Sequence, residues 1–284
     1  MPDSHNNYTT KIWMEEAESD DPFATRSAYC AGYDVYNDIL GKASWSEYLF
    51  LLFQQEKPLP WQAKLLNDLA VTLANPGMRD HSVLAAMNAG VGGSTSAACL
   101  MAALGVGAGQ LNGAHEVYLA IQNWENCKQD FAAWQHFINN PQTEEITDIW
   151  DPIEHFPGFN PNADRCAGVI LDSLKHLASI AEKDGPLDWL YGHRELLEAT
   201  TNMPLNFSGL AAACLYELGF SAEEGEMLFL LLRLPGAAIH ALEQSSYGWR
   251  KFPFYHNGLI LTPREEKHAM AANNNHMELS HEQQ

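Results

Sequence analysis

Residues 85–109 constrain the fold of this chain more than any other stretch. Almost every position in it holds Ala, Gly, Ser or another small apolar residue. A helix of such residues carries little side chain, so another backbone can approach it closely. Gly costs about 1 kcal/mol relative to Ala in a helix, and a second helix or a second copy of the chain must therefore hold the segment. The sequence predicts a helical hairpin, either buried in a monomer or packed at a homodimer interface.

Polar residues stand at both ends of this small-residue hairpin. Arg79, Asp80 and His81 precede it, and Gln110 and Asn112 follow it. We therefore expect ligand-binding groups at the polar ends of the hairpin.

The charge and composition of the chain exclude several classes of partner. A net charge of −20 over 284 residues argues against nucleic acid and anionic membrane surfaces, which proteins bind through Lys and Arg. No run of 18 apolar residues predicts a membrane span, and the N-terminus has no basic region followed by an apolar stretch. The five cysteines are scattered and odd in number, which indicates reduced thiols in the cytoplasm.

Apolar periodicity predicts an all-α fold with one short hairpin near residues 33–39. Breaks at Pro, Gly and Asn separate the helices, and Ser44 or Ser46 is a suitable N-cap for the first of them. The expected helices are 44–53, 61–74, the hairpin 82–109, 114–122, 130–137, 165–182, 187–199, 206–218, 222–234 and 236–244. Residues 143–149 could form a further helix, and the irregular loop 151–164 is of the kind that carries function.

Two blocks of the sequence resemble the citrate synthase superfamily. Residues 32–66, GYDVYNDILGKASWSEYLFLLFQQEKPLPWQAKLL, are similar to its early block, a Gly-Tyr-Asp hairpin followed by a helix and a Leu-Pro turn. Residues 202–244 begin NMPLNFSG and end HALEQ, and they are similar to its last core helices, which carry N-x-D-G and G-x-x-x-H-x-x-E-Q. The length and the pairing of the blocks look closer to citryl-CoA lyase domains than to full-length citrate synthases.

The resemblance covers residues 22–262 and implies a domain organisation. It implies a large helical domain, a small helical domain inserted at about 125–200, and a homodimer formed through the small-residue helices. We expect residues 1–21 to be a flexible N-terminal arm and residues 263–284 to be a flexible tail, since both are polar.

Family members use two histidines and an aspartate for acid–base chemistry, and this chain differs at all three positions. The turn at 110–114, QLNGA, resembles P-L-H-G-A and places Asn112 where the first His is expected. The loop PGFNP has Asn160 and Pro161 where the second His belongs, and NFSG places Ser208 at the Asp position. An Asn can donate a hydrogen bond but cannot carry a proton as His does, and a Ser hydroxyl is not a base at neutral pH without a partner.

The resemblance and the local chemistry together give a list of candidate site residues. The candidate catalytic residues are Asn112, Ser208 and His81. The candidate substrate-binding residues are Asn160, Asp164, Arg165, Asn206, His240, Arg233 and Arg250. Guanidinium groups suit carboxylates, but surface ion pairs account equally well for Arg233 and Arg250. The alternative for His81 is an exposed side chain beside a helix N-cap, and the alternative for His240 is a structural polar end of a core helix.

Other motifs give weaker signals. His193 lies in a Gly-His-Arg triplet at the wrong spacing for the family, and His155 could replace the missing loop His. The segment HEVYL lacks the second His of HExxH, so we expect no metal site. The glycines at 90–93 and 105–109 have neither a preceding strand nor a following Lys-Ser or Lys-Thr, so they are not phosphate loops.

Two functions remain open. The first is an enzyme that forms or cleaves a C–C bond in an acyl-CoA or a hydroxy-polycarboxylate, with coenzyme A or acyl-CoA as substrate and no covalent cofactor. The second is an inactive homologue that binds a ligand or a protein partner, such as an active paralogue. The three substitutions favour the second function. The first function stays open because Asn112, Asn160 and Ser208 can still form hydrogen bonds.

Overall fold

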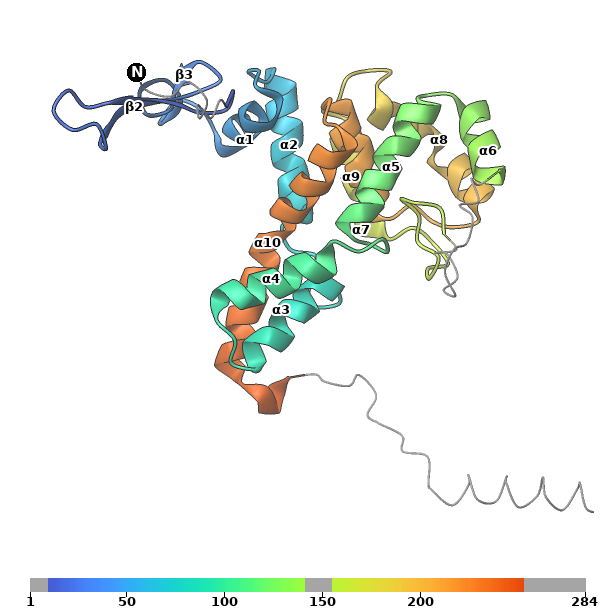
Figure 1. Ribbon diagram of the computed structural model, residues 1–284. Helices are drawn as coiled ribbons and strands as arrows, with labels where there is room; N and C mark the ends of the chain where they lie inside the picture. The colour runs from blue at the N-terminus through green and yellow to red at the C-terminus, as the bar shows by residue number, and fades with distance from the viewer. Residues whose placement is uncertain (1–9, 141–154, 253–284) are drawn as a thin grey trace, which may run out of the picture.

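The computed structural model describes residues 10–140 and 155–252. A small antiparallel sheet of order β1-β2-β3 extends from one end of a helical body (Figure 1). Its strands are β1 (Met14–Ala17), β2 (Thr25–Cys30) and β3 (Tyr33–Asp34), and a π-helical turn, η1 (Val35–Ile39), follows.

The expectations for the N-terminal region hold only in part. Residues 14–17, expected in a flexible arm, pair with β2. The short hairpin expected near residues 33–39 is formed by β2 and β3, whereas residues 35–39 are helical. In β2 the buried residues are Ala28 and Cys30, two positions apart, which is the period of a strand with one covered face. The strand is too short for this two-residue period to be recognised in the sequence. The expected helix 143–149 and the tail 263–284 lie outside the described residues.

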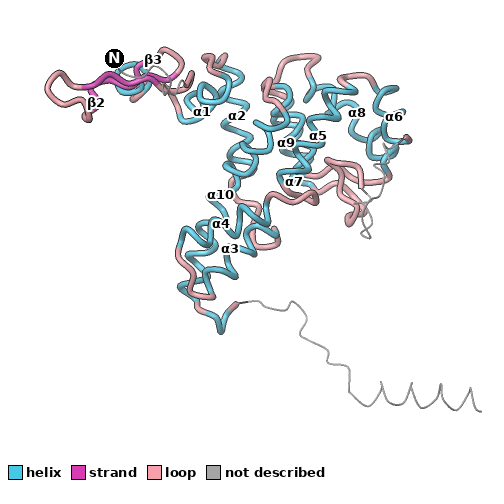
Figure 2. Tube along the Cα trace, in the orientation of Figure 1, coloured by secondary structure: helices cyan, strands magenta, loops and turns pink. Residues whose placement is uncertain are grey.

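The rest of the described chain is helical, which confirms the all-α fold (Figure 2). The first five helices are α1 (Trp45–Gln54), α2 (Pro60–Leu73), α3 (His81–Val91), α4 (Ser96–Gly107) and α5 (Ala114–Cys127). The next five are α6 (Phe131–Asn139), α7 (Gly168–Ala178), α8 (Pro186–Thr201), α9 (Phe207–Glu217) and α10 (Ala222–Tyr247), before the 3-10 turn η2 (Trp249–Lys251). The expected small-domain insertion corresponds to the segment with α6, α7 and α8, and its status as a domain stays a prediction.

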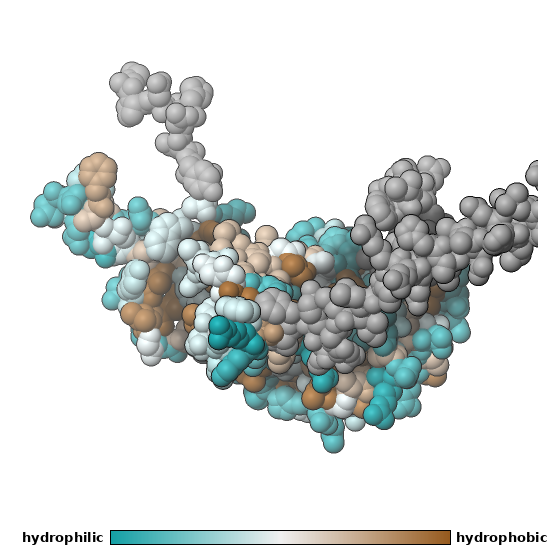
Figure 3. Space-filling model, turned by 90° about the horizontal axis from the view of Figure 1, so that it is seen from below, coloured by the Kyte–Doolittle hydropathy of each residue, from teal (hydrophilic) through white to brown (hydrophobic). Residues whose placement is uncertain are grey.

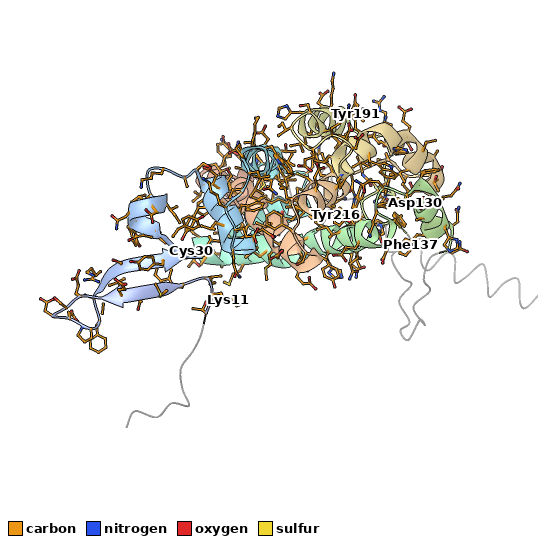
Figure 4. The ribbon with its side chains drawn as sticks, turned by 90° about the horizontal axis from the view of Figure 1, so that it is seen from above. Lys11, Cys30, Asp130, Phe137, Tyr191 and Tyr216 are labelled. Atoms are coloured by element: carbon orange, nitrogen blue, oxygen red, sulfur yellow. The ribbon has the colours of Figure 1, made fainter. Side chains whose placement is uncertain are left out.

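The main hydrophobic core lies around α5 and α9, and it fixes the part of the chain that carries the candidate site. Buried leucines of α2, α7, α8 and α9 surround these two helices. At one end, the ring of Trp124 packs against Trp134, Trp189 and Tyr216, with centroids 5.0, 5.6 and 5.9 Å away. Tyr216 lies inside the helical body and Tyr191 on its outside (Figure 4). The candidate site is therefore built on rigid helix ends.

The small-residue hairpin is the pair α3 and α4, which packs on the second half of α10 below the main core (Figure 1). A smaller core, which includes Val83, Met87 and Ala241, holds the three helices together. At Gly90 an added Cβ would lie 2.8 Å from the carbonyl oxygen of Ala241, so only glycine allows this approach. The hairpin thus packs within one protomer.

The outer side of α4 stays uncovered in the single chain. Ala97, Met101 and Gly105, spaced four residues apart on one face, are exposed, and the Met101 side chain keeps 64% of its surface. Seen from below, the molecule shows apolar surface in patches between polar ones (Figure 3). The hairpin therefore combines a buried face with an exposed apolar one.

Helix α10 runs through Pro235, where two separate helices were expected. The break at Leu234–Pro235–Gly236 does not occur, because a tertiary contact supports the backbone there. The N–H of Gly236 donates to the carbonyl of Ala74, at 2.7 Å, and a Cβ on Gly236 would lie 2.6 Å from that oxygen. The end of α2 thus fits against α10 at the glycine.

By length and composition α10 could cross a membrane, and within the described residues it is the one such helix. Its apolar window is 44% buried inside the protein, and core helices of water-soluble proteins pass the same test. The helix also carries the buried Arg233, which pairs with a carboxylate. These contacts identify it as a core helix.

Candidate functional site

Three segments of the chain meet at the carboxylate of Glu116, which has no exposed surface. Glu116 lies in the first turn of α5. Its Oε2 accepts from the backbone N–H of Asn112 at 2.6 Å, and its Oε1 accepts from the N–H of Gly158 at 2.9 Å and from Nδ2 of Asn206 at 2.7 Å. Such charge-assisted bonds compensate the burial of a carboxylate. We call Glu116, Asn112, Gly158 and Asn206 the Glu116 hub.

The loop before Asn160 lies antiparallel against the segment before α9. The N–H of Asn160 donates to the carbonyl of Pro204 at 2.8 Å, and the N–H of Asn206 donates to the carbonyl of Gly158 at 3.0 Å. Gly158 has a φ of +94°, and a Cβ on Gly209 would lie 2.3 Å from its oxygen. Two glycines are needed where the loop crosses α9.

The hub joins two of the sequence-predicted residues, Asn112 and Asn206, and a third, Ser208, lies two positions after Asn206. Asn206 caps α9, since its Oδ1 accepts from the N–H of Gly209 at 2.9 Å. Its Nδ2 also lies 3.4 Å from Oδ1 of Asn112. Asn112 is half-buried with a φ of +55°, which Asn tolerates better than most residues. Ser208 follows in the first turn of α9 and is 1% exposed.

Arg233 joins the hub to the start of α3. The buried guanidinium pairs with the carboxylate of Asp80 and donates to the carbonyl of Asn112 at 2.9 Å. Burial lowers the pKa of Arg233, and the charge of Asp80 opposes this shift. Asp80 also caps α3, through the N–H groups of Ser82 and Val83. In this arrangement Arg233 is engaged by protein groups and positions the Asn112 turn.

The remaining candidates lie at the edge of the hub or away from it. His81, the first residue of α3, is exposed, as are Asp164 and Arg165. The side chain of Asn160 accepts from the N–H of Asn162 at 3.0 Å. Asn160 follows Gly158 of the hub by two residues, and His81 follows Asp80, the partner of Arg233.

His240 and Arg250 lie farther along the chain from Arg233. His240 comes seven residues after Arg233 on α10, about 10 Å along the axis, and its Nε2 lies 3.1 Å from Oδ1 of Asn75. Arg250 is exposed in η2, with its guanidinium 5.4 Å from the ring centre of Trp249. The structure does not bring these two side chains to the hub of the same protomer.

Sequence reasoning missed Glu116 and gave little weight to His155. The His155 side chain is 3% exposed, and its Nε2 lies 3.5 Å from Oε1 of Glu116. Neither ring nitrogen of His155 forms a hydrogen bond. The available signal was an acidic residue on the apolar face of α5, four residues after the Asn112 turn, but it was considered only as part of a zinc motif.

Two other sequence signals have structural explanations. The ring of His193 stacks on Trp189 with a centroid distance of 4.3 Å, and its Nδ1 lies 2.9 Å from the carbonyl of Trp189. It therefore belongs to the aromatic core.

Over residues 10–140 and 155–252, no group of three His, Cys, Asp or Glu side chains is placed to hold a metal ion.

No family model and no curated protein sequence matches the chain. Its structure is similar to citryl-CoA lyase from Hydrogenobacter thermophilus, with a TM-score of 0.66 and 17% identity, over 92% of this chain and 100% of that one. It is also similar to ATP citrate lyase from Methanothrix soehngenii in complex with citrate and coenzyme A, with a TM-score of 0.67 and 18% identity, over 92% of this chain and 42% of that one.

A third similar structure is citrate synthase from the thermophilic archaeon Thermoplasma acidophilum, in a ternary complex with carboxymethyl coenzyme A and oxaloacetate. The TM-score is 0.54 and the identity 16%, over 78% of this chain and 58% of that one. These similarities show that the chain has the citrate synthase superfamily fold, as the sequence resemblance implied.

Proposed function

We propose that the surface of the Glu116 hub binds a carboxylate or acyl-CoA ligand, and that the chain forms or cleaves a C–C bond in it without the family's His, His and Asp. The observation that carries the proposal is the contact of the half-buried Asn112 with Asn206, beside the buried carboxylate of Glu116. Proteins of the same fold are found in complex with citrate and coenzyme A, which supports this class of ligand.

In this proposal Asn112 donates a hydrogen bond to a carbonyl or enolate oxygen. A fixed donor of this kind stabilises the charge that develops when a carbon acid loses a proton. Ser208, in the first turn of α9, and His81, at the start of α3, supply further hydrogen bonds from the two neighbouring helix ends. Asn160, Asp164 and Arg165 form the outer edge of the same site. His240 and Arg250 lie away from the hub, so they would contact a ligand only if it were bound in a different position.

We further propose that the chain is a homodimer that pairs through α4. The support is its exposed apolar face of Ala97, Met101 and Gly105, because single chains in water rarely leave such a contiguous face uncovered. Residues of this size let two helices pack closely. A cytoplasmic location fits the five cysteines, all of which are free thiols.

A second candidate function is a non-catalytic, ligand-binding or partner subunit, such as a companion of an active paralogue. The ion pair of Arg233 and Asp80 favours it, because two charged groups next to the site neutralise each other. Asn112 and Ser208, at the family's catalytic positions, are uncharged as well. Both functions predict the same fold, but only the first predicts catalytic turnover of a ligand.

A thermal-shift screen of the full chain tests the proposal. The panel contains coenzyme A, acetyl-CoA, longer acyl-CoAs, oxaloacetate and citrate. A ligand that binds only the folded state adds about 2.7 kcal/mol of stability at a hundredfold excess over its Kd. We expect at least one carboxylate or acyl-CoA to raise the Tm. No shift with any member of the panel would contradict the proposal.

A further inference from the structure

His155 lies beside Glu116, but its ring nitrogens take no part in the hydrogen bonds of the hub. Glu116 is fully buried and accepts three hydrogen bonds, whereas the buried ring of His155 makes none. Buried polar groups in proteins are nearly always hydrogen-bonded, so two free ring nitrogens on one buried His require an explanation.

The geometry gives the two ring nitrogens different surroundings. Nε2 lies 3.5 Å from Oε1 of Glu116, so a hydrogen on Nε2 faces a carboxylate. In that tautomer Nδ1 carries a lone pair and can accept a proton, and the carboxylate stabilises the imidazolium that results. This division, with one nitrogen oriented by a carboxylate and the other free, is how a His acts as a general base.

The pair also lies next to the residues of the proposed site. Glu116 binds the N–H of the half-buried Asn112, and His155 lies three residues before Gly158, where the chain crosses α9. Among the described residues, the charge of Glu116 acts on Arg233 of α10, which is paired with Asp80 on the approach to α3.

We propose that His155 is the proton-transfer residue of this site and that Glu116 is its positioning residue, replacing the acid–base groups absent at Asn112 and Ser208. The inference rests on the proposed function. The C–H bond beside the thioester carbonyl breaks, the proton passes to Nδ1, and the electron pair passes to the thioester oxygen as an enolate. Solvent then exchanges the proton on the imidazolium, and the reverse step returns it to carbon.

The test follows this half-reaction with the full chain in D₂O. Acetyl-CoA is the probe, with and without oxaloacetate or citrate, and proton NMR measures the loss of methyl protons. Calorimetry measures acetyl-CoA binding on the same samples. The variants are His155→Gln, Glu116→Gln and, as a matched control on the exposed side of α6, His136→Gln.

We expect His155→Gln to slow the exchange at least a hundredfold while binding changes less than threefold, and His136→Gln to match the unmodified chain. Glu116→Gln should slow the exchange as well, since the ring of His155 loses the carboxylate beside Nε2. Exchange at an unchanged rate in His155→Gln would overturn the inference. Binding without exchange in the unmodified chain would also overturn it but leave the proposed ligand site standing, whereas absence of binding would refute both.

Ring ¹⁵N NMR of the unmodified chain is a second readout, independent of whether the variants fold. We expect the His155 ring signals to change when acetyl-CoA is added. Ring signals that stay the same with and without acetyl-CoA would overturn the assignment.

Discussion

The side-chain amide of Asn206 donates a hydrogen bond of 2.7 Å to Oε1 of Glu116, across 90 positions of the sequence. The same Asn206 caps α9, while Glu116 binds the N–H of Asn112. One buried contact therefore fixes the start of α9 against the start of α5. Asn112 and Ser208, the two residues proposed to stand at the family's catalytic positions, lie at these two helix starts.

Replacing Asn206 by Ala should destabilise the protein strongly. The change removes a helix cap and a charge-assisted hydrogen bond to a buried carboxylate, so we expect a loss of about 2–4 kcal/mol in the free energy of unfolding. Urea denaturation measures it. Asn139→Ala at the exposed end of α6 is the control and should change stability by about 0.5 kcal/mol or less. Equal effects of the two changes would contradict the role of the hub.

Removing the charge of Arg233 should be costly because it leaves the half-buried carboxylate of Asp80 without its cationic partner. We expect Arg233→Met to cost about 3–5 kcal/mol. Adding Asp80→Asn removes the unpaired charge, so the double variant should be no less stable than Arg233→Met alone. Urea unfolding of the two single variants and the double variant gives the coupling energy. Additive losses would show that the pair does not act as a unit.

Stability should fall with acid partly through Asp68. Burial raises the pKa of this carboxyl, but hydrogen bonds from Lys64, His176 and Asn67 outweigh it and lower the pKa to about 2. Because the folded pKa lies below the unfolded value of about 3.9, the stabilisation is full above pH 4 and is lost between about pH 4 and 2.

The urea midpoint from pH 5 to 2 checks the role of Asp68. Since Lys64 and His176 are largely exposed, we expect a contribution of about 1–2 kcal/mol. Asp68→Asn should be less stable at pH 5 and should show a flatter acid profile. Parallel profiles for the two proteins would contradict the link that Asp68 makes between α2 and α7.

The proposed dimer can be tested by overpacking α4. Ala98→Leu adds bulk at the edge of the exposed face of Ala97 and Met101, so it should weaken the pairing of two copies. Sedimentation velocity should show a dimer for the unmodified chain and for the control Val71→Leu, an exposed site on α2. A monomeric unmodified chain, or a dimeric Ala98→Leu variant of the same affinity, would sink the interface proposal.

Most of the helical fold was predictable because its signals are local. Ser44 caps α1 as expected, in a capping box with Glu47, and the small residues mark α3 and α4. The break at Pro235 was predicted wrongly because the compensating donor, Gly236, binds Ala74, a contact that sequence spacing does not reveal.

The site was only partly predictable from sequence. Asn112, Asn206 and Ser208 were singled out through motif positions. The structure places Asn206 in contact with Asn112 and buries Ser208 in the first turn of α9, while their roles stay predictions. Glu116 and His155 were undervalued because their significance depends on burial and on each other, 39 positions apart. In the sequence Glu116 looks like a surface carboxylate, because the hydrogen-bond donors that allow its burial come from distant parts of the chain.

Calorimetric titration of the full chain with acetyl-CoA and with citrate tests the central claim most directly, when Asn112→Gly is titrated beside it. Glycine keeps the left-handed backbone of residue 112 and deletes only the amide that the site offers to a ligand. The account predicts saturable binding of at least one ligand and a loss of about tenfold or more in affinity in Asn112→Gly. Binding that is unaffected by this change, or no binding of either ligand, would contradict it.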